Sequence, residues 1–226
     1  MVDFVEHEDA DALAEALAAE TALHLSAAIA ARGRASFAVP GGSTPRDYLA
    51  VLGRQALDWP RIAIMPTDER WTPPNDDRSN ERMIRAALGL ANPEFLAFWR
   101  GGEDPASAAP KIAKDFAPHL PLDLVVLGMG ADMHCASLFP EGDGLAAAMA
   151  ADAAETVAAI TAPGAAEPRV TLTAPVLSGA AHLRLLITGA EKRAALDAAL
   201  DANDPLAAPI GAVLRRAKDA VVHWAP

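Results

Sequence analysis

The chain has 226 residues, of which 52% are hydrophobic, and it carries a formal net charge of −11. This length is enough for one large α/β domain with a substantial core, and we expect a single domain over residues 1–226. The negative charge and the lack of a basic stripe argue against nucleic acid as a partner.

The cysteine content and the hydropathy pattern indicate the compartment. The single cysteine, Cys135, excludes an internal disulfide and fits a reducing environment. The amino terminus has no basic region followed by an apolar core, so we expect no secretory signal. No run of 18 or more apolar residues is visible, so we expect a cytoplasmic protein without a membrane partner.

Helices and strands are predicted to alternate along the chain. An alanine-rich amphipathic helix over 9–31 is expected to stop at Gly33. Further helices are predicted at 45–52, 79–88, 106–117, 145–151, 190–200 and 210–216. Strands are predicted at 36–39, 61–65, 95–99, 124–127, 156–161, 183–188 and 220–224, with a loop at 163–168. This alternation predicts an α/β fold with a mostly parallel sheet flanked by helices on both faces.

A glycine turn between the strand at 36–39 and the next helix has the features of an anion site. Gly41 and Gly42 precede Ser43 and Thr44, and Thr44 is predicted to cap the helix with proline at its first position. The free N–H groups of a helix amino terminus favour negative charge. The alternative is that Ser43 and Thr44 act only as caps. The Walker pattern is absent, so this is not a nucleotide loop of that type.

Charged residues follow the strand at 61–65. Asp68, Glu69 and Arg70 stand before a loop rich in proline and asparagine. Charged side chains at the carboxyl end of a strand are candidates for a site. Taken alone, a surface ion pair of little energetic value explains them better than a site does.

The segment that follows the strand at 124–127 carries the most chemistry. Gly128 and Gly130 let the backbone turn sharply, and Asp132 and His134 come directly after them. A dinucleotide fingerprint is excluded because Met133 replaces its third glycine. Imidazole titrates near neutral pH, so His134 is the best general-base candidate, and Asp132 could orient the ring. A packed polar histidine is the alternative.

Other catalytic classes have little support in the sequence. Cys135 is beside His134, but adjacent side chains rarely face each other, so we expect a packed small residue. No Gly-x-Ser-x-Gly elbow occurs, which argues against a serine esterase. The histidines and the cysteine show no ligand spacing for zinc, so no metal is expected.

Several stretches, taken together, resemble the glucosamine-6-phosphate isomerase/6-phosphogluconolactonase family. They are Gly41–Pro45, Asp68–Trp71 with Ser79 and Asn80, Arg169–Thr173, Leu127–Pro140, and Gly189 with Lys192. The resemblance implies a Rossmann-like fold of the sugar-phosphate isomerase/deaminase type. It also implies a carboxylic ester hydrolase that opens 6-phospho-D-glucono-1,5-lactone in the oxidative pentose phosphate pathway without a cofactor.

The resemblance also implies roles for single residues. His134, Asp132 and Asp68 would be catalytic, and Asn80 would support them. The phosphorylated lactone would be bound by Gly41, Gly42, Ser43, Thr44, Arg70, Gly130, Arg169 and Lys192. Arginine suits forked phosphate contact and lysine acts as a point charge. We expect the cationic groups at one end of a cavity and the imidazole at its other end.

The chain departs from the family pattern at two positions, and alternatives remain. The family usually has glycine at Met133 and threonine at Cys135. A deaminase or isomerase of the same fold is one alternative, but those enzymes carry glutamate where Phe139 stands here. A non-catalytic sugar-phosphate sensor is the other. We expect a monomer or a weak homodimer.

Overall fold

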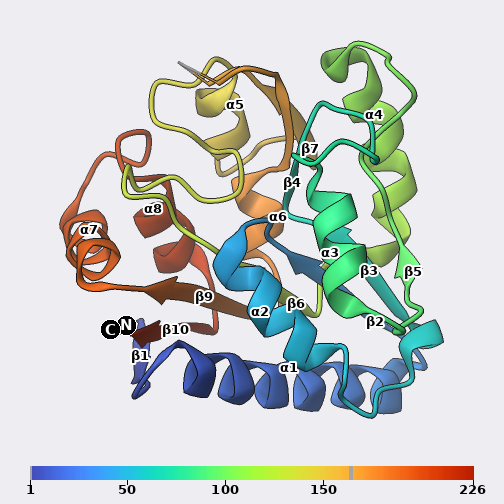
Figure 1. The fold of residues 1–226 in the computed structure, drawn as a ribbon. Helices are drawn as coiled ribbons and strands as arrows, with labels where there is room; N and C mark the ends of the chain where they lie inside the picture. Colours follow the sequence, from blue (N-terminus) through green and yellow to red (C-terminus); the bar gives the residue numbers. More distant parts are fainter. Residues whose placement is uncertain (1, 163–164) are drawn as a thin grey trace.

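The computed structural model describes residues 2–162 and 165–226. Within them, seven strands form a parallel sheet in the order β1-β10-β9-β6-β2-β3-β5 (Figure 1). The strands are β1 (Asp3–Glu6), β2 (Ala35–Val39), β3 (Ile62–Pro66), β5 (Glu94–Phe95), β6 (Leu124–Leu127), β9 (His182–Thr188) and β10 (Ala220–Ala225). The central strands are buried along their whole length, as expected for a sheet covered on both faces.

Helices cover both faces of this sheet, which confirms the predicted fold class. One face carries α1 (Ala10–Arg32), α2 (Ser43–Leu52) and α3 (Asn80–Leu88). The core on the other face contains α6 (Ala174–Ser178), α7 (Ala190–Asp201) and α8 (Pro209–Arg216), together with α4 (Pro105–Phe116) and α5 (Leu145–Met149), which pack mainly on the strand Val157–Ile160. A hydrophobic core lies on each face of the sheet, and alternate residues of each strand belong to one core or the other, because successive side chains point to opposite faces. Phe37 packs in the core with α1, and Ala38 packs in the other core.

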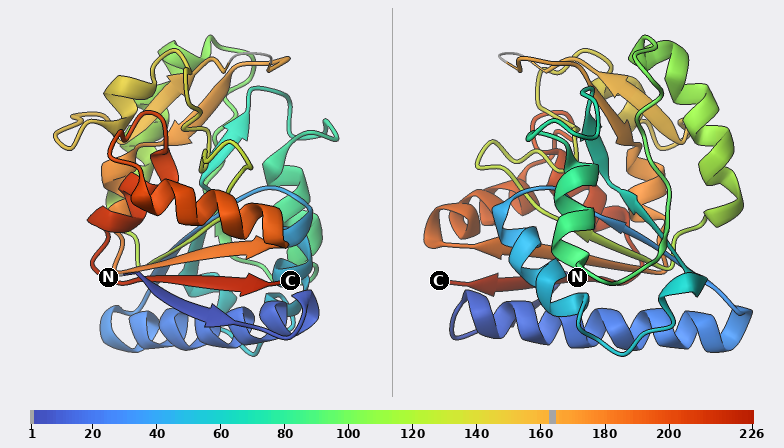
Figure 2. Two further views of the ribbon diagram at one scale, coloured as in Figure 1. Left: turned by 90° about the vertical axis from the view of Figure 1, so that its left-hand side faces the viewer. Right: turned by 45° about the vertical axis from the view of Figure 1, so that its right-hand side comes forward.

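A second, smaller sheet was not predicted. Its antiparallel strands are β4 (Asp68–Arg70), β8 (Arg169–Leu172) and β7 (Val157–Ile160), and it lies across the molecule from α1 (Figure 2). Thr67 joins the two sheets, because its N–H donates to Val39 and its carbonyl accepts from Leu172, both at 2.9 Å. The pairing sets Arg70 directly opposite Arg169.

Some predicted boundaries were wrong. Helix α2 begins at Ser43, with Gly42 as the residue before it at φ 117°, so Thr44 lies inside the helix and is not its cap. Strand β1 was missed, and the strand predicted at 95–99 covers only Glu94–Phe95. Two 3-10 turns, Trp59–Arg61 and Ala117–His119, complete the elements. The loop predicted at 163–168 starts with two residues outside the described part.

Helix α1 is, by length and composition alone, apolar enough to cross a membrane. Its leucines at 13, 17 and 25 are buried against the sheet and α2. These leucines pack α1 against the hydrophobic core. Its ends follow the predicted chemistry, since Asp9 caps the start and Gly33, at φ 77°, ends it.

The sheet topology determines where loops can meet. From β2 the chain continues to β3 on one side, and from β6 it continues to β9 on the other side. Because the strands are parallel, the loops after β2, β3, β6 and β9 emerge at one edge of the sheet. The predicted glycine segments and Asp68–Arg70 follow these four strands, whereas Arg169 is in the strand Arg169–Leu172 of the second sheet.

Candidate active site

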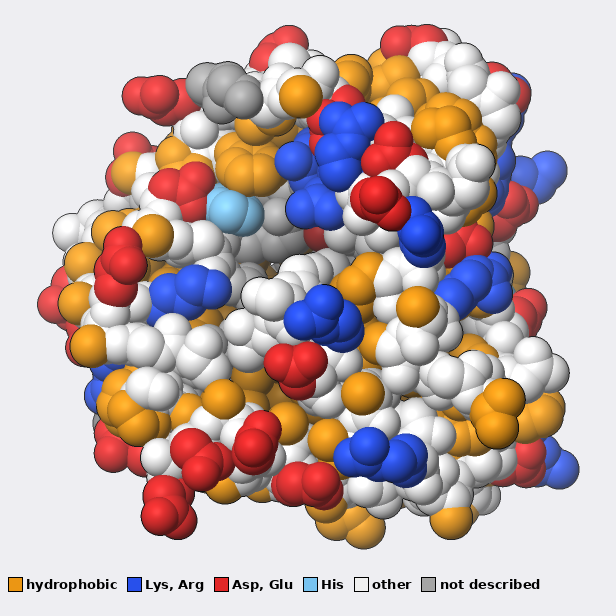
Figure 3. Space-filling model, viewed as in Figure 1, with side chains coloured by type: hydrophobic (Ala, Val, Ile, Leu, Met, Phe, Trp, Pro, Cys, Tyr) orange, Lys and Arg blue, Asp and Glu red, His pale blue; other side chains and the backbone are white. Residues whose placement is uncertain are grey.

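A cavity of about 400 Å³ opens at the carboxyl edge of the parallel sheet. In the space-filling view it is a hollow bordered by Lys and Arg side chains and one histidine (Figure 3). It is lined by Pro40, Gly41, Gly42, Ser43, Thr44, Pro45, Asp68, Arg70, Asn80, Gly128, Met129, Gly130, His134, Ala136, Phe139, Arg169, Leu186 and Lys192. All the residues predicted from the sequence line it except Asp132, which lies behind His134.

The Gly130–His134 turn presents the imidazole to this cavity. The N–H of Gly130 donates to the His134 carbonyl at 3.1 Å, and the N–H of Met133 donates to the Gly130 carbonyl at 3.0 Å. The turn brings His134 Nδ1 to 2.5 Å from Asp132 Oδ1. A carboxylate can only accept, so in the neutral ring Nδ1 carries the proton and Nε2 has the lone pair.

Two backbone positions make this turn possible. A Cβ on Gly130 would lie 2.3 Å from the His134 ring and 2.4 Å from Asp132, so the close approach requires glycine. Met133 is left-handed at φ 66°, a conformation that favours glycine. That strain accounts for the glycine that the family usually has there. The Met133 carbonyl accepts from Ile210 at 3.2 Å, and its side chain packs against the core.

Asp68 is a buried carboxylate at the wall of the cavity. Its two oxygens accept from the hydroxyls of Ser137, at 2.5 Å, and Thr67, at 3.2 Å. The amide of Asn80 donates to the Asp68 carbonyl at 2.8 Å, which makes Asn80 a supporting contact. A Cβ on Gly41 would lie 1.9 Å from the Asn80 amide oxygen, so Gly41 lets the two loops meet.

Sequence reasoning missed the role of Glu69. Its side chain is buried and accepts from the N–H groups of Arg70, Asn80 and Glu81 and from the Ser79 hydroxyl. Burial raises its pKa, and the three backbone donors oppose that shift. Glu69 therefore holds the start of α3 against β4. The burial of this glutamate cannot be predicted from the sequence, because it depends on the pairing of segments that are far apart in the chain.

Ser137 was also missed. Its hydroxyl binds Asp68, and its N–H donates to the Thr171 hydroxyl at 3.3 Å, so it joins the central loop to both β4 and β8. Its neighbour Cys135 is fully buried, as predicted, and burial raises the pKa of the thiol. A buried, protonated thiol is a poor nucleophile.

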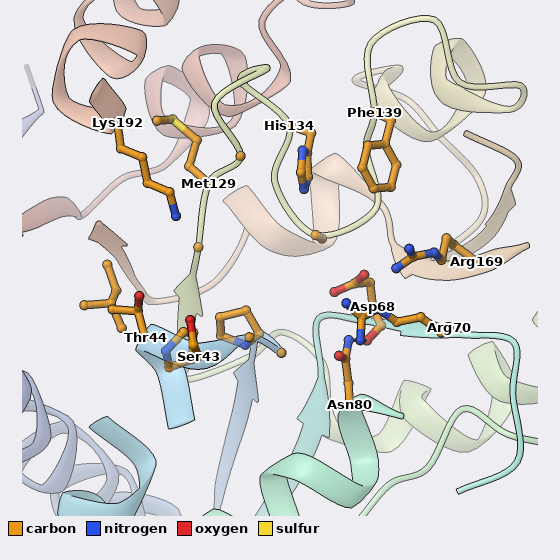
Figure 4. A pocket seen from close by; sticks show the side chains of 18 residues that line it. Ser43, Thr44, Asp68, Arg70, Asn80, Met129, His134, Phe139, Arg169 and Lys192 are labelled. Carbon is orange, nitrogen blue, oxygen red and sulfur yellow. Dashed lines mark hydrogen bonds between the residues drawn. The ribbon is translucent and has the colours of Figure 1, made fainter. Parts of the chain in front are cut away.

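The amino terminus of α2 and a lysine of α7 form one side of the cavity. Helices α2 and α7 start after Gly42 and Gly189, which have positive φ and provide no side-chain cap. The first N–H groups of a helix have no partner within it. Lys192, in the first turn of α7, points towards Ser43 and Thr44 (Figure 4).

Two arginines form the opposite side. Arg70 donates to the Arg78 carbonyl at 2.5 Å. Arg169 is partly buried, its Nε has no hydrogen-bond partner among the described residues, and burial lowers its pKa while Asp68 opposes the shift. Figure 4 shows Arg70, Arg169 and Asp68 together, with His134 between them and Lys192.

This arrangement differs from the expectation of cations at one end and imidazole at the other. The cationic side chains form two groups, and the imidazole lies between them. Arg70 and Arg169 belong to the antiparallel sheet that was not predicted, whereas Lys192 belongs to the helix that follows β9 of the parallel sheet. Among the described residues, no group of three or more His, Cys, Asp or Glu could hold a metal ion.

Comparison with known proteins agrees with this geometry. The family model for glucosamine-6-phosphate isomerases/6-phosphogluconolactonase matches residues 8–224. A 6-phosphogluconolactonase of Rhizobium meliloti (strain 1021) is 44% identical over 225 residues, which cover 97% of this chain and 97% of the relative. One of Pseudomonas putida is 36% identical over 225 residues, which cover 97% and 92%.

A solved structure of the same family has the same fold. The crystal structure of a 6-phosphogluconolactonase from Shewanella baltica OS155 superimposes with a TM-score of 0.95 at 32% identity and covers 100% of this chain and 98% of that one. The whole-chain match of the family model, the identities above 30% and the shared fold lead to one conclusion. The chain belongs to the glucosamine-6-phosphate isomerase/6-phosphogluconolactonase family.

Proposed function

We propose that this chain hydrolyses 6-phospho-D-glucono-1,5-lactone to 6-phosphogluconate, a step of the oxidative pentose phosphate pathway. The relatives described above carry the name 6-phosphogluconolactonase. The observation that carries the proposal is the His134 imidazole, which is oriented by Asp132 and stands in a cavity with cationic groups on both sides.

The proposed chemistry is general-base attack of water on the lactone carbonyl. His134 Nε2 takes a proton from the water as its oxygen bonds to the carbonyl carbon. Asp132 stabilises the imidazolium that forms. The bond between the carbonyl carbon and the ring oxygen then breaks, and the ring oxygen leaves with the proton from His134. The products are the free acid and a regenerated imidazole.

The substrate phosphate is assigned to the side of Lys192 and Thr44. A phosphate dianion is favoured by the amino terminus of α2 and by the lysine charge. Gly42, Ser43 and Thr44 at the start of α2 line the cavity together with Lys192 of α7. This assignment orients the sugar ring across the cavity and beneath His134.

The lactone end is assigned to the side of Arg70 and Arg169. Negative charge develops on the carbonyl oxygen during attack, and a partly buried guanidinium stabilises such charge better than water does. Asp68 keeps acceptor capacity for sugar hydroxyls, because each of its oxygens accepts one hydroxyl from the protein.

The test uses freshly prepared 6-phosphogluconolactone, with spontaneous hydrolysis subtracted. We expect the wild type to exceed buffer clearly and His134→Ala to lose roughly a hundredfold or more in kcat, the scale of a lost general base. A wild-type rate equal to that of buffer would refute the proposal. Release of ammonia from glucosamine 6-phosphate would favour the deaminase, and binding without turnover would favour the sensor.

The remaining expectations stay predictions. They are a single domain, a cytoplasmic location, a monomer or weak homodimer, the absence of nucleic-acid and membrane partners, and activity without a metal or cofactor. Activity in the presence of a chelator and the mass measured by light scattering test the last of these and the oligomeric state.

A further inference from the structure

The rings of His134 and Phe139 lie against each other at the cavity wall (Figure 4). Their centroids are 4.2 Å apart and their planes are inclined by 33°. Asp132 fixes only the Nδ1 edge of the imidazole, and one hydrogen bond leaves the ring able to swing about its own side-chain bonds. A second contact, on the face of the ring, removes that freedom.

Phe139 is itself well anchored. Its carbonyl accepts the N–H of Gly142 at 3.0 Å, and the preceding turn is closed by the bond from Leu138 N–H to the Cys135 carbonyl at 3.0 Å. Cys135 and Leu138 are fully buried in the core. The backbone that carries the phenyl ring is thus held in place, and the ring is partly buried against the core, whereas His134 stands on a strained turn at the cavity edge.

The phenyl ring also neighbours Arg169. The guanidinium carbon lies 5.8 Å from the Phe139 centroid, within the range of a cation–π contact. The phenyl ring thus contacts both the imidazole and the guanidinium and separates them. When His134 holds a proton, both of these groups are positively charged. Water or the arginine side chain would fill that space if the ring were absent.

We infer that Phe139 is a positioning residue: its ring holds the His134 imidazole against Asp132 and directs Nε2 at the substrate. The inference rests on the proposed lactone hydrolysis. Phe139 contributes no proton and no charge, so its effect is on the rate of the chemical step and not on phosphate binding.

The kinetic test compares Phe139→Ala with the wild type. We expect kcat to fall roughly ten- to a hundredfold, the scale of a misplaced catalytic group, with KM changed less than about twofold. Phe139→Tyr keeps the flat ring and restores most of kcat. Phe95→Ala is the matched control, because Phe95 is a partly exposed phenyl ring under Arg85, outside the cavity.

A double-mutant cycle separates positioning from general damage. In a His134→Ala background, Phe139→Ala should change the residual rate by less than about twofold, since there is no imidazole left to position. Losses that multiply in the double variant would overturn the inference. An unchanged kcat in Phe139→Ala would overturn it as well.

A readout independent of turnover completes the test. In nitrogen-15 NMR spectra, with the His134 signals assigned by their loss in His134→Ala, the wild type should show one tautomer with the proton on Nδ1. In Phe139→Ala those signals should broaden or average between tautomers. Unchanged signals refute the positioning role, even if the wild type proves inactive towards the lactone and the proposed function fails.

Discussion

Five of the six histidines lie in two regions that use the same side chain in opposite ways. His134 stands in the cavity with one ring nitrogen open. His7, His24, His182 and His223 belong to the α1 ionic cluster, which we define as these four with Glu20, Arg184 and Asp219. This cluster lies between α1 and strands β9 and β10, away from the cavity.

The α1 ionic cluster is centred on a buried arginine. Arg184 donates to Glu20 at 2.5 Å and to Asp219 at 3.1 Å. Asp219 also binds His182 Nδ1 at 2.5 Å, and the His24 ring stacks on His182 with centroids 3.8 Å apart. Each of its charged groups has a partner of opposite sign, so the cluster ties α1 to the sheet.

The cavity leaves its polar groups open instead. Among the described residues, Arg169 Nε and His134 Nε2 have no hydrogen-bond partner and Lys192 has no ion-pair partner. Charged groups that satisfy one another stabilise a fold, and charged groups left open around a cavity await a ligand. The comparison predicts that cavity variants lose activity and that variants of the α1 ionic cluster lose stability.

A loss of activity on the scale of the His134→Ala loss is expected from Gly130→Ala. The added Cβ would lie 2.3 Å from the imidazole and 2.4 Å from the Asp132 carboxylate, so both groups must shift from this geometry. We expect roughly a hundredfold loss of kcat with little change in the thermal midpoint. Gly128→Ala is the matched control, because its Cβ would meet nothing closer than 4.0 Å. Equal losses in both variants would contradict this account.

The largest effect on stability is expected from Arg184→Met. It leaves Glu20 and Asp219 without their shared cation, and breaking a partly buried charge network costs about 3 kcal/mol. Denaturant unfolding measures this loss, and kcat at a temperature where the protein is folded should stay near the wild-type value. A large fall in kcat with unchanged stability would contradict the distinction between a cavity that serves activity and an α1 ionic cluster that serves stability.

A smaller effect is expected from Lys192→Ala. Losing one cationic contact to the phosphate should raise KM for the lactone by roughly tenfold and make it less sensitive to salt. Lys114→Ala, on the exposed side of α4, removes the same charge away from the cavity and is the control. An unchanged KM in Lys192→Ala would contradict the assignment of the substrate phosphate to the Lys192 side of the cavity.

The smallest effect is a pH dependence of stability. Burial lowers the pKa of His24 and of His7 below the usual 6.5, and His223 with Arg184 lowers that of Glu20 from 4.5 to about 2. The unfolded chain therefore takes up protons first, so stability is full above about pH 6.5 and falls as the pH falls towards 2. Thermal melts across this range should decline, and Glu20→Gln should flatten the decline below pH 4.5. A wild-type melt independent of pH would contradict the assignment.

The sequence predicted the parallel sheet and the glycine turns because these depend on local patterns. Apolar runs mark the buried strands β2, β3 and β6, and Gly33 and Gly53 end their helices as expected. It also brought Asp132 and His134 together correctly, since the turn between them is local.

The sequence did not predict features that depend on long-range pairing. Strand β4 consists of Asp68, Glu69 and Arg70, which have low strand propensity and become a strand only by pairing with β8. For the same reason the burial of Glu69 and the contact from Ser137 to Asp68 were invisible. The split of the cations into two groups follows from that second sheet.

The most direct measurement compares His134→Ala with His182→Ala. Both variants remove one imidazole whose Nδ1 lies 2.5 Å from an aspartate, but only His134 lines the cavity. With both proteins shown to be folded, initial rates on fresh 6-phosphogluconolactone should fall roughly a hundredfold in His134→Ala and stay near wild type in His182→Ala. Comparable rates in the two variants would contradict the assignment of His134 as the base.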